Sequence, residues 1–90
     1  SPKKSCIQCF WTLADPTRLE LIEILKKRSS NVNNLTKDLG VTQPTVSHHL
    51  KTLDTMGLVV KSKEGRETTY RFNEDYLCKG CGTYNTPLLV

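Results

Sequence analysis

Hydrophobic residues in the first third of the chain recur at helical spacing and predict two helices. The first covers about residues 3–14 and the second residues 17–28. Their apolar faces carry Ile7, Phe10, Trp11 and Ala14 in the first helix, and Leu21, Ile22 and Leu25 in the second. Asp15 suits the N-cap of the second helix, and Pro16 suits its first position, where the N–H that proline lacks would have no helical partner.

A short helix and a longer helix follow, joined by a tight turn. The polar connector SSNVNN leads into the short helix over residues 34–39, and Gly40 fits the position just after its end. Thr42 can cap the longer helix, QPTVSHHLKTLDTMG, which tolerates Pro44 in its first turn and ends at Gly57. One side of the longer helix is predicted to pack inward, with Val46, Leu50 and Leu53.

The period of the pattern then changes from helical to alternating. Two β-rich runs, LVVKSK and ETTYRF, are separated by EGR and predict a β-hairpin. A short helix, a turn, a longer helix and a hairpin in this order are typical of a winged helix-turn-helix. We therefore expect a mainly α fold of three to four helices with a small two-stranded β-hairpin, the wing.

Length and composition place these elements in one domain. Ninety residues with 37% hydrophobic and 24% charged content are ordinary for a globular protein of this size. The chain has no run of about 18 apolar residues, and its basic start lacks the apolar stretch of a secretory signal. We expect a single domain over residues 1–90 that is cytoplasmic and has no membrane partner.

The charge of the chain is compatible with a polyanionic partner. The net charge is +4 and the sequence pI is about 9.0. Charge alone is weak support for nucleic-acid binding, but the cations here lie in local clusters. They include the KKR run at 26–28 and, around the predicted hairpin, Lys61, Lys63, Arg66 and Arg71.

The longer helix carries hydrogen-bonding side chains on and beside its polar side. They are Gln43, Thr45, Ser47 and His48, with the cation Lys51 one turn further on. Side chains of this kind can read base edges in a major groove, and glutamine can pair with adenine through two hydrogen bonds. We expect Lys51 to hold a phosphate, and the cations of the wing to reach phosphate or an adjacent minor groove. The alternative is an ordinary solvated helix face, which the basic wing disfavours.

The segments LADPTRLELIEIL and LGVTQPTVSHHLKTLDTMGLVVKSKEGRETTYRF resemble the ArsR-type winged-helix repressors. The resemblance covers about residues 7–73 and includes the ADPTR start, the TVSHHLK helix and the wing in the family's order. It implies a homodimeric transcriptional repressor that binds double-stranded DNA at a palindromic operator and leaves it when an inducer binds. The DNA-binding set is then Thr42, Gln43, Thr45, Ser47, His48, Lys51, Lys63 and Arg66, of which Gln43, Ser47 and His48 would contact bases.

The chain departs from this family at the inducer sites. Metal-sensing members often place cysteines at the start of the short helix, but the stretch NVNNLTKDLG has none. Others use aspartate and histidine on a closing helix, whereas the tail over about residues 74–90 has no histidine and carries Gly80, Gly82 and Pro87. Neither familiar inducer site is therefore present, and the resemblance names no inducer for this chain.

Two C-x-x-C motifs lie near the two chain ends. CIQC supplies Cys6 and Cys9 on the first helix, and CKGC supplies Cys78 and Cys81 in the tail. At this spacing one turn delivers two thiolates to one tetrahedral ion. The gap of 68 residues is longer than in a zinc ribbon, so the fold itself must bring the two pairs together.

The preferred interpretation of the four cysteines is a structural Zn²⁺ that ties the tail to the first helix, because closed four-cysteine sites are typically structural. Three alternatives stay open. The same thiolates could bind an inducer metal, the cysteines could form disulfides with no metal, or they could be inert thiols. The ligands could also come from two subunits.

Other features of the sequence have simpler explanations. His48 and His49 point about 100° apart on a helix and do not converge on one ion, so we expect His48 to face DNA and His49 to border the core. Phe10 and Trp11 fit a core or a dimer interface. A thioredoxin-type enzyme is disfavoured because neither C-x-x-C lies in a βαβ context, so we expect no enzyme. A winged helix that binds protein is the remaining alternative.

Overall fold

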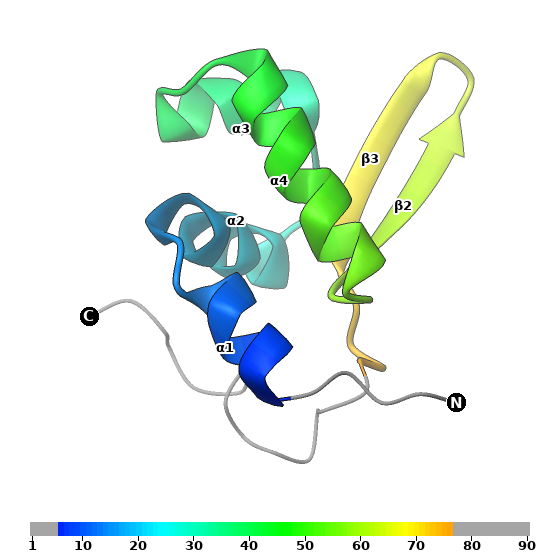
Figure 1. The fold of residues 1–90 in the computed structure, drawn as a ribbon. Helices are drawn as coiled ribbons and strands as arrows, with labels where there is room; N and C mark the ends of the chain where they lie inside the picture. The colour runs from blue at the N-terminus through cyan, green and yellow to red at the C-terminus, as the bar shows by residue number, and fades with distance from the viewer. Residues whose placement is uncertain (1–5, 77–90) are drawn as a thin grey trace.

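The computed structural model describes the backbone of residues 6–76 and the side chains of residues 9–76, which form four helices and a three-stranded antiparallel sheet (Figure 1). The elements are α1 (Cys6–Leu13), α2 (Pro16–Lys27), β1 (Ser30–Asn31), α3 (Val32–Leu39), α4 (Gln43–Thr55), β2 (Val59–Glu64) and β3 (Glu67–Phe72). The hairpin of β2 and β3 extends so that its tip lies at the same end of the domain as the start of α4 (Figure 1). The predicted winged helix-turn-helix fold is confirmed.

The start of α2 has the geometry predicted from its sequence. Asp15 is the N-cap, and its Oδ1 accepts hydrogen bonds from the backbone N–H groups of Thr17 at 2.9 Å and Arg18 at 3.1 Å. These two donors lack partners within the helix, so the cap stabilises the first turn. Pro16 occupies the first helical position, as expected.

The segment between α2 and α3 differs from the prediction of a plain polar connector. Ser30 and Asn31 form β1, which pairs with Tyr70 and Thr69 of β3, so the sheet has a third strand in addition to the predicted hairpin. The helix α3 begins at Val32, two residues earlier than predicted, because Asn31 is its N-cap and accepts from the backbone N–H of Asn34 at 2.8 Å. Serine and asparagine have low strand propensity, and β1 exists through its pairing with β3.

The turn between α3 and α4 depends on Gly40. Its φ of 68° lies in the left-handed region, and its N–H donates to the carbonyl of Thr36 at 2.9 Å, which closes α3 as predicted. Thr42 occupies the N-cap position of α4, but its side chain makes no capping hydrogen bond. Its hydroxyl instead pairs with the hydroxyl of Thr45 at 2.8 Å, so the predicted side-chain cap is wrong.

The core lies where α2, α3, α4 and the base of the sheet meet. The fully buried apolar side chains are Leu21, Ile22, Leu35, Val46, Leu50 and Leu53. The inward side of α4 predicted from the spacing is therefore confirmed. Tyr76, beyond the sheet, is also buried and packs edge-on against Phe72 with ring centroids 5.3 Å apart. Burial of each large apolar side chain contributes about 1.5–3 kcal/mol to stability.

Candidate nucleic-acid interface

The helix α4 separates its side chains into a buried side and an exposed side. Leu50 and its apolar neighbours hold the helix against the core, and Gln43, Ser47, His48 and Lys51 are exposed. These four belong to the set that the sequence assigned to DNA. A rigid helix with a solvated row of hydrogen-bonding groups has the form needed to enter a groove of about 12 Å width.

Thr42 and Thr45 are positioned differently from the rest of that set. Thr45 is half-buried, and its hydroxyl lies 2.8 Å from the hydroxyl of Thr42 across the first turn of α4. Each hydroxyl can still accept a further hydrogen bond, because a hydroxyl has one donor and two acceptor sites. The pair therefore presents two hydroxyl oxygens that can accept at the N-terminus of the helix, and one of the two hydroxyls also keeps its proton free to donate.

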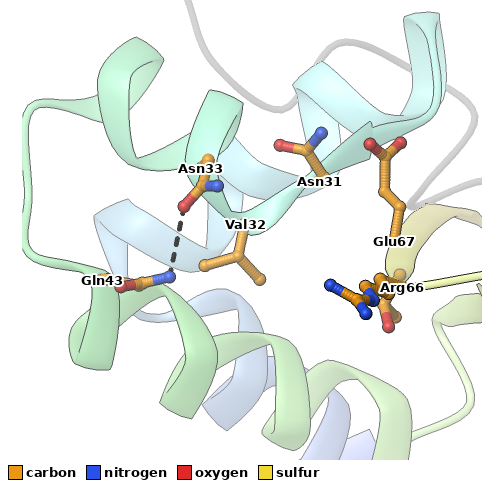
Figure 2. Close-up of a pocket in the computed structure, with 7 residues that line it drawn as sticks. Asn31, Val32, Asn33, Gln43, Arg66 and Glu67 are labelled. Atoms are coloured by element: carbon orange, nitrogen blue, oxygen red, sulfur yellow. Dashed lines mark hydrogen bonds between the residues drawn. The ribbon is translucent and has the colours of Figure 1, made fainter.

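The wing brings cations to the same end of the domain as the start of α4. Lys61, Lys63 and Arg66 are all exposed, and Arg66 follows Gly65 in the turn between β2 and β3. Arg66 and Gln43 line a common groove of about 420 Å³. The Arg66 guanidinium points toward the side of this groove that is formed by the starts of α3 and α4 (Figure 2). One predicted base-contacting residue and one predicted wing residue thus line the same groove.

The other lining residues of this groove were not predicted from the sequence. They are Asn31, Val32 and Asn33 at the start of α3, and Glu67 and Thr68 of β3 (Figure 2). The sequence pattern assigns Asn31, Val32 and Asn33 to a polar connector. Its repeated asparagines were the available signal, since asparagine favours helix N-caps and offers both donor and acceptor groups.

His48 and Lys51 line a second groove, on the side of α4 that faces α1. This groove has a volume of about 390 Å³ and also contains Trp11, Thr52, Thr55 and Met56. Trp11 is 63% exposed and Phe10 62%, so these aromatic side chains are not part of the core. Of the predicted site residues, Gln43 and Arg66 therefore line the first groove, and His48 and Lys51 line the second.

The two histidines occupy different environments, as predicted. His48 is exposed, whereas the side chain of His49 is only 12% exposed and its Nε2 lies 3.9 Å from Oδ1 of Asp15. Burial lowers the pKa of His49 below its ordinary value, the nearby charges of Arg18 and His48 lower it further, and Asp15 opposes the shift. His49 thus joins α4 to the start of α2.

The first pair of cysteines lies on α1. Cys6 and Cys9 are three residues apart in the helix, and Cys9 is half-buried against the core. Cys78 and Cys81 lie outside the described residues. Among the side chains of residues 9–76, no group of three or more His, Cys, Asp or Glu is arranged to hold a metal ion. None of the helices in this range is long and apolar enough to cross a membrane.

Comparisons with known proteins agree with this architecture. The family model described as bacterial regulatory protein, arsR family, matches residues 15–61. The chain is 35% identical over 65 residues to the arsenical resistance operon repressor of Staphylococcus xylosus, covering 72% of this chain and 62% of that protein. It is 37% identical over 70 residues to the transcriptional regulator CmtR of Mycobacterium tuberculosis, covering 78% of this chain and 59% of CmtR.

A solved structure extends the likeness to three dimensions. The homodimeric winged helix-turn-helix DNA-binding domain from Mycobacterium bovis superposes with a TM-score of 0.70 at 26% identity, covering 76% of this chain and 63% of that one. This chain spans about three fifths of the length of the two curated relatives, which are named as a repressor and a transcriptional regulator rather than as enzymes. By the match over residues 15–61 and the shared winged-helix fold, the chain belongs to the ArsR family of bacterial regulatory proteins.

Proposed function

We propose that this chain binds double-stranded DNA sequence-specifically and represses transcription from the operator it occupies. The observation that carries the proposal is the exposed row of Gln43, Ser47, His48 and Lys51 on a helix whose opposite side is fully buried. Arg66, an exposed cation of the wing, lines a groove together with Gln43 at the start of that helix, where a DNA backbone would pass. Repression is supported by the name of the Staphylococcus relative.

The roles within the site divide by chemistry. Gln43, Ser47 and His48 would contact base edges, while Lys51, Lys63 and Arg66 would contact phosphates. Thr42 and Thr45 would meet the DNA at the start of α4 through their paired hydroxyls. The base contacts set which sequence is preferred, and the phosphate contacts set how strongly affinity depends on salt.

The binding unit is proposed to be a homodimer on a palindromic operator. The Mycobacterium bovis domain of the same fold is homodimeric, and the exposed Phe10 and Trp11 give this chain an apolar surface on α1. Two recognition helices related by a two-fold axis would enter successive major grooves, with half-sites about 10 bp apart.

Salt titration of DNA binding by matched variants tests this proposal. Gln43→Ala and His48→Ala should relax the preference at one base step each and leave the salt slope near that of the parent. Lys51→Ala and Arg66→Ala should weaken binding to every duplex and lower the slope by about one unit for each lost phosphate contact. Lys27→Ala is the control, because Lys27 is an exposed cation outside the proposed contact set.

Two results would contradict the proposal. Binding to duplex DNA that is absent or insensitive to salt would instead favour a winged helix that binds protein. Gln43→Ala and His48→Ala could keep the parent's base preference while Lys51→Ala weakens binding. In that case the chain binds DNA, but the assignment of base contacts to Gln43 and His48 is wrong.

The cysteines are proposed to hold one structural Zn²⁺ in a site of Cys6, Cys9, Cys78 and Cys81. Two observations support the fit of a tetrahedral thiolate site. Positions three apart on a helix share a face, so Cys6 and Cys9 of α1 can serve one ion. Cys9 also packs against the cluster that contains Tyr76, the last described residue, and two further residues to Cys78 span at most about 7 Å.

Metal analysis and chelation test the zinc site. We expect one Zn²⁺ per chain, four thiols that react only after chelation, and a melting temperature that falls when the metal is removed. Cys78→Ser should lose the metal, whereas Ser62→Ala, on the exposed wing, should keep it. A reduced, metal-free protein of unchanged melting temperature would exclude the structural site, and blocked thiols released only by reductant would indicate disulfides instead.

A further inference from the structure

We propose that Asn33 is a positioning residue for Gln43, and that the hydrogen bond between them sets the base that Gln43 prefers. The inference rests on the proposed DNA-binding function and adds to it a residue that was not predicted. Nε2 of Gln43 donates to Oδ1 of Asn33 at 3.2 Å, across the gap between the start of α4 and the start of α3 (Figure 2). Both side chains are exposed, so neither bond partner is required by the core.

The structure holds Gln43 in one of its two amide orientations, with Nε2 donating to Asn33. A free glutamine side chain rotates about three torsions and can present either its carbonyl or its amide nitrogen to a base. With Nε2 directed at Asn33, Oε1 is left to accept from a base, and the second N–H of Nε2 is left to donate. Ordering the side chain before binding also removes part of the entropy cost of contact.

The start of α3, which carries Asn33, is itself held in place by a helix cap. Asn33 lies in the first turn of α3, where Asn31 caps the helix by accepting from the backbone N–H of Asn34 at 2.8 Å. Gln43 is the first residue of α4, directly after the N-cap. The hydrogen bond therefore connects two helix starts on opposite sides of the Gly40 turn, which limits how far the Gln43 amide can move.

The remaining groups of Gln43 match adenine best. In the major groove, adenine offers an N6 amino donor beside an N7 acceptor, the complement of a carbonyl with one adjacent N–H. Cytosine offers only the N4 amino donor, and guanine and thymine offer acceptors where Oε1 would need a donor. We therefore expect adenine at the base step that Gln43 reads, and a weaker adenine preference once Asn33 is removed.

A double-mutant cycle on DNA binding tests whether Asn33 acts through Gln43. The full 90-residue chain first selects its preferred duplex from a randomised library. Binding is then measured to that duplex and to the three duplexes with another base at the Gln43 step, for the parent, Asn33→Ala, Gln43→Ala and the double variant. Asn34→Ala is the matched control, since Asn34 is an exposed neighbour on the same helix. Melting temperatures are recorded for all.

We expect Asn33→Ala to reduce the adenine preference by about three- to tenfold, as the loss of one net hydrogen bond would. The same substitution should change nothing further in the Gln43→Ala background, and Asn34→Ala should match the parent. Asn33→Asp keeps the acceptor oxygen, so it should retain the preference while its added charge weakens binding to all four duplexes. The melting temperatures should be equal, because a positioning role does not depend on stability.

Three results would overturn the inference. An equal loss from Asn33→Ala in both backgrounds would mean that Asn33 contacts DNA independently of Gln43. An unchanged base preference in Asn33→Ala would mean that the hydrogen bond positions nothing. A parent protein that selects no duplex would overturn the proposed function together with the inference, a result visible before any variant is measured.

Discussion

The guanidinium of Arg18 lies against the imidazole of His49, with Nη1 3.3 Å from Nδ1, and joins α2 to α4, the proposed recognition helix. The same side chain donates from Nε to the carbonyl of Thr12 at 2.8 Å and from Nη2 to the carbonyl of Trp11 at 3.3 Å. Arg18 is only 6% exposed and lies 4.8 Å from the centroid of the Trp11 ring. One buried arginine thus connects three helices and satisfies two carbonyls at the end of α1.

This contact predicts that stability falls on mild acidification. Arg18 has only donors, so Nδ1 of His49 must accept and the imidazole must be neutral. Burial lowers the pKa of His49 below its ordinary value of 6.5, and the positive charge of Arg18 acts in the same direction. Below pH 6.5 the unfolded chain therefore binds more protons than the folded one, and the free energy of unfolding decreases until the folded pKa is passed.

Urea unfolding between pH 7.5 and pH 5 measures this effect. His49→Asn removes the titrating ring and should flatten the pH dependence in this window. Thr55→Ala is the control, since Thr55 is an exposed, non-titrating residue of the same helix and should leave the dependence unchanged. An equal slope in His49→Asn and the parent would assign the effect to another group.

Arg18→Lys should destabilise the fold even though it preserves the charge. A lysine ammonium is a point donor and cannot reproduce the planar fork that reaches the Thr12 and Trp11 carbonyls together. Leaving buried acceptors without donors should lower the free energy of unfolding by about 1.5–3 kcal/mol. Denaturant midpoints and m-values measure the change.

The same substitution at Arg28 provides the comparison. Arg28 pairs with Asp38 at 3.0 Å, but its side chain is 65% exposed, and exposed pairs contribute about 0–1 kcal/mol. Arg28→Lys should therefore stay within that range. Equal denaturant midpoints for Arg18→Lys and Arg28→Lys would show that the hydrogen bonds of the buried Arg18 guanidinium do not contribute to stability.

Elements with strong local signals could be predicted from the sequence. Asp15 and Pro16 mark the start of α2 through chemistry confined to four residues, and the spacing of Val46, Leu50 and Leu53 identifies the buried side of α4. The hairpin strands were predicted within about one residue of their observed limits. In each case the residues that determine the structure are neighbours along the chain.

Features that depend on distant partners were not predictable. The strand β1 exists only because Ser30 and Asn31 meet β3 some forty residues later. The burial of Arg18 requires three helices to converge on one side chain, and charged residues are rarely buried without such partners. The bond between Asn33 and Gln43 likewise depends on how the Gly40 turn brings two helix starts together. Sequence spacing carries no signal for any of these contacts.

Gly40→Ala should destabilise the helix-turn-helix through the backbone alone. Gly40 has φ +68°, and a Cβ built there would meet no heavy atom within 4 Å, so there is no steric clash with a neighbour. The left-handed conformation costs an alanine roughly 1–2 kcal/mol relative to glycine. Gly40→Asn should cost less, because asparagine tolerates this conformation.

Thermal and denaturant unfolding of Gly40→Ala and Gly40→Asn show whether the loss of stability comes from the backbone conformation or from the size of the added side chain. A smaller loss in Gly40→Asn than in Gly40→Ala is expected if φ is the cause. Equal losses would instead point to the size of the added side chain, in conflict with the open space around Gly40.

Phe10→Ala should weaken the proposed homodimer without unfolding the subunit. The Phe10 side chain is 62% exposed on α1, so it contributes little to the core of one chain but much apolar area to an interface. Loss of one buried phenylalanine at an interface should raise the dimer Kd about tenfold or more. Trp11 is the poorer choice for this test because its ring lies against Arg18, and its removal would disturb the subunit as well.

Sedimentation equilibrium measures the Kd, and the concentration dependence of the melting temperature gives an independent reading, since a dimer is stabilised by mass action. Glu20→Ala, an exposed position on α2, should behave as the parent. Phe10→Ala should still bind single half-sites, because Gln43 and the wing belong to one subunit, but should lose the added affinity for a palindrome. A parent that stays monomeric at tens of micromolar, or a Phe10→Ala dimer as tight as the parent, would place the interface elsewhere or exclude it.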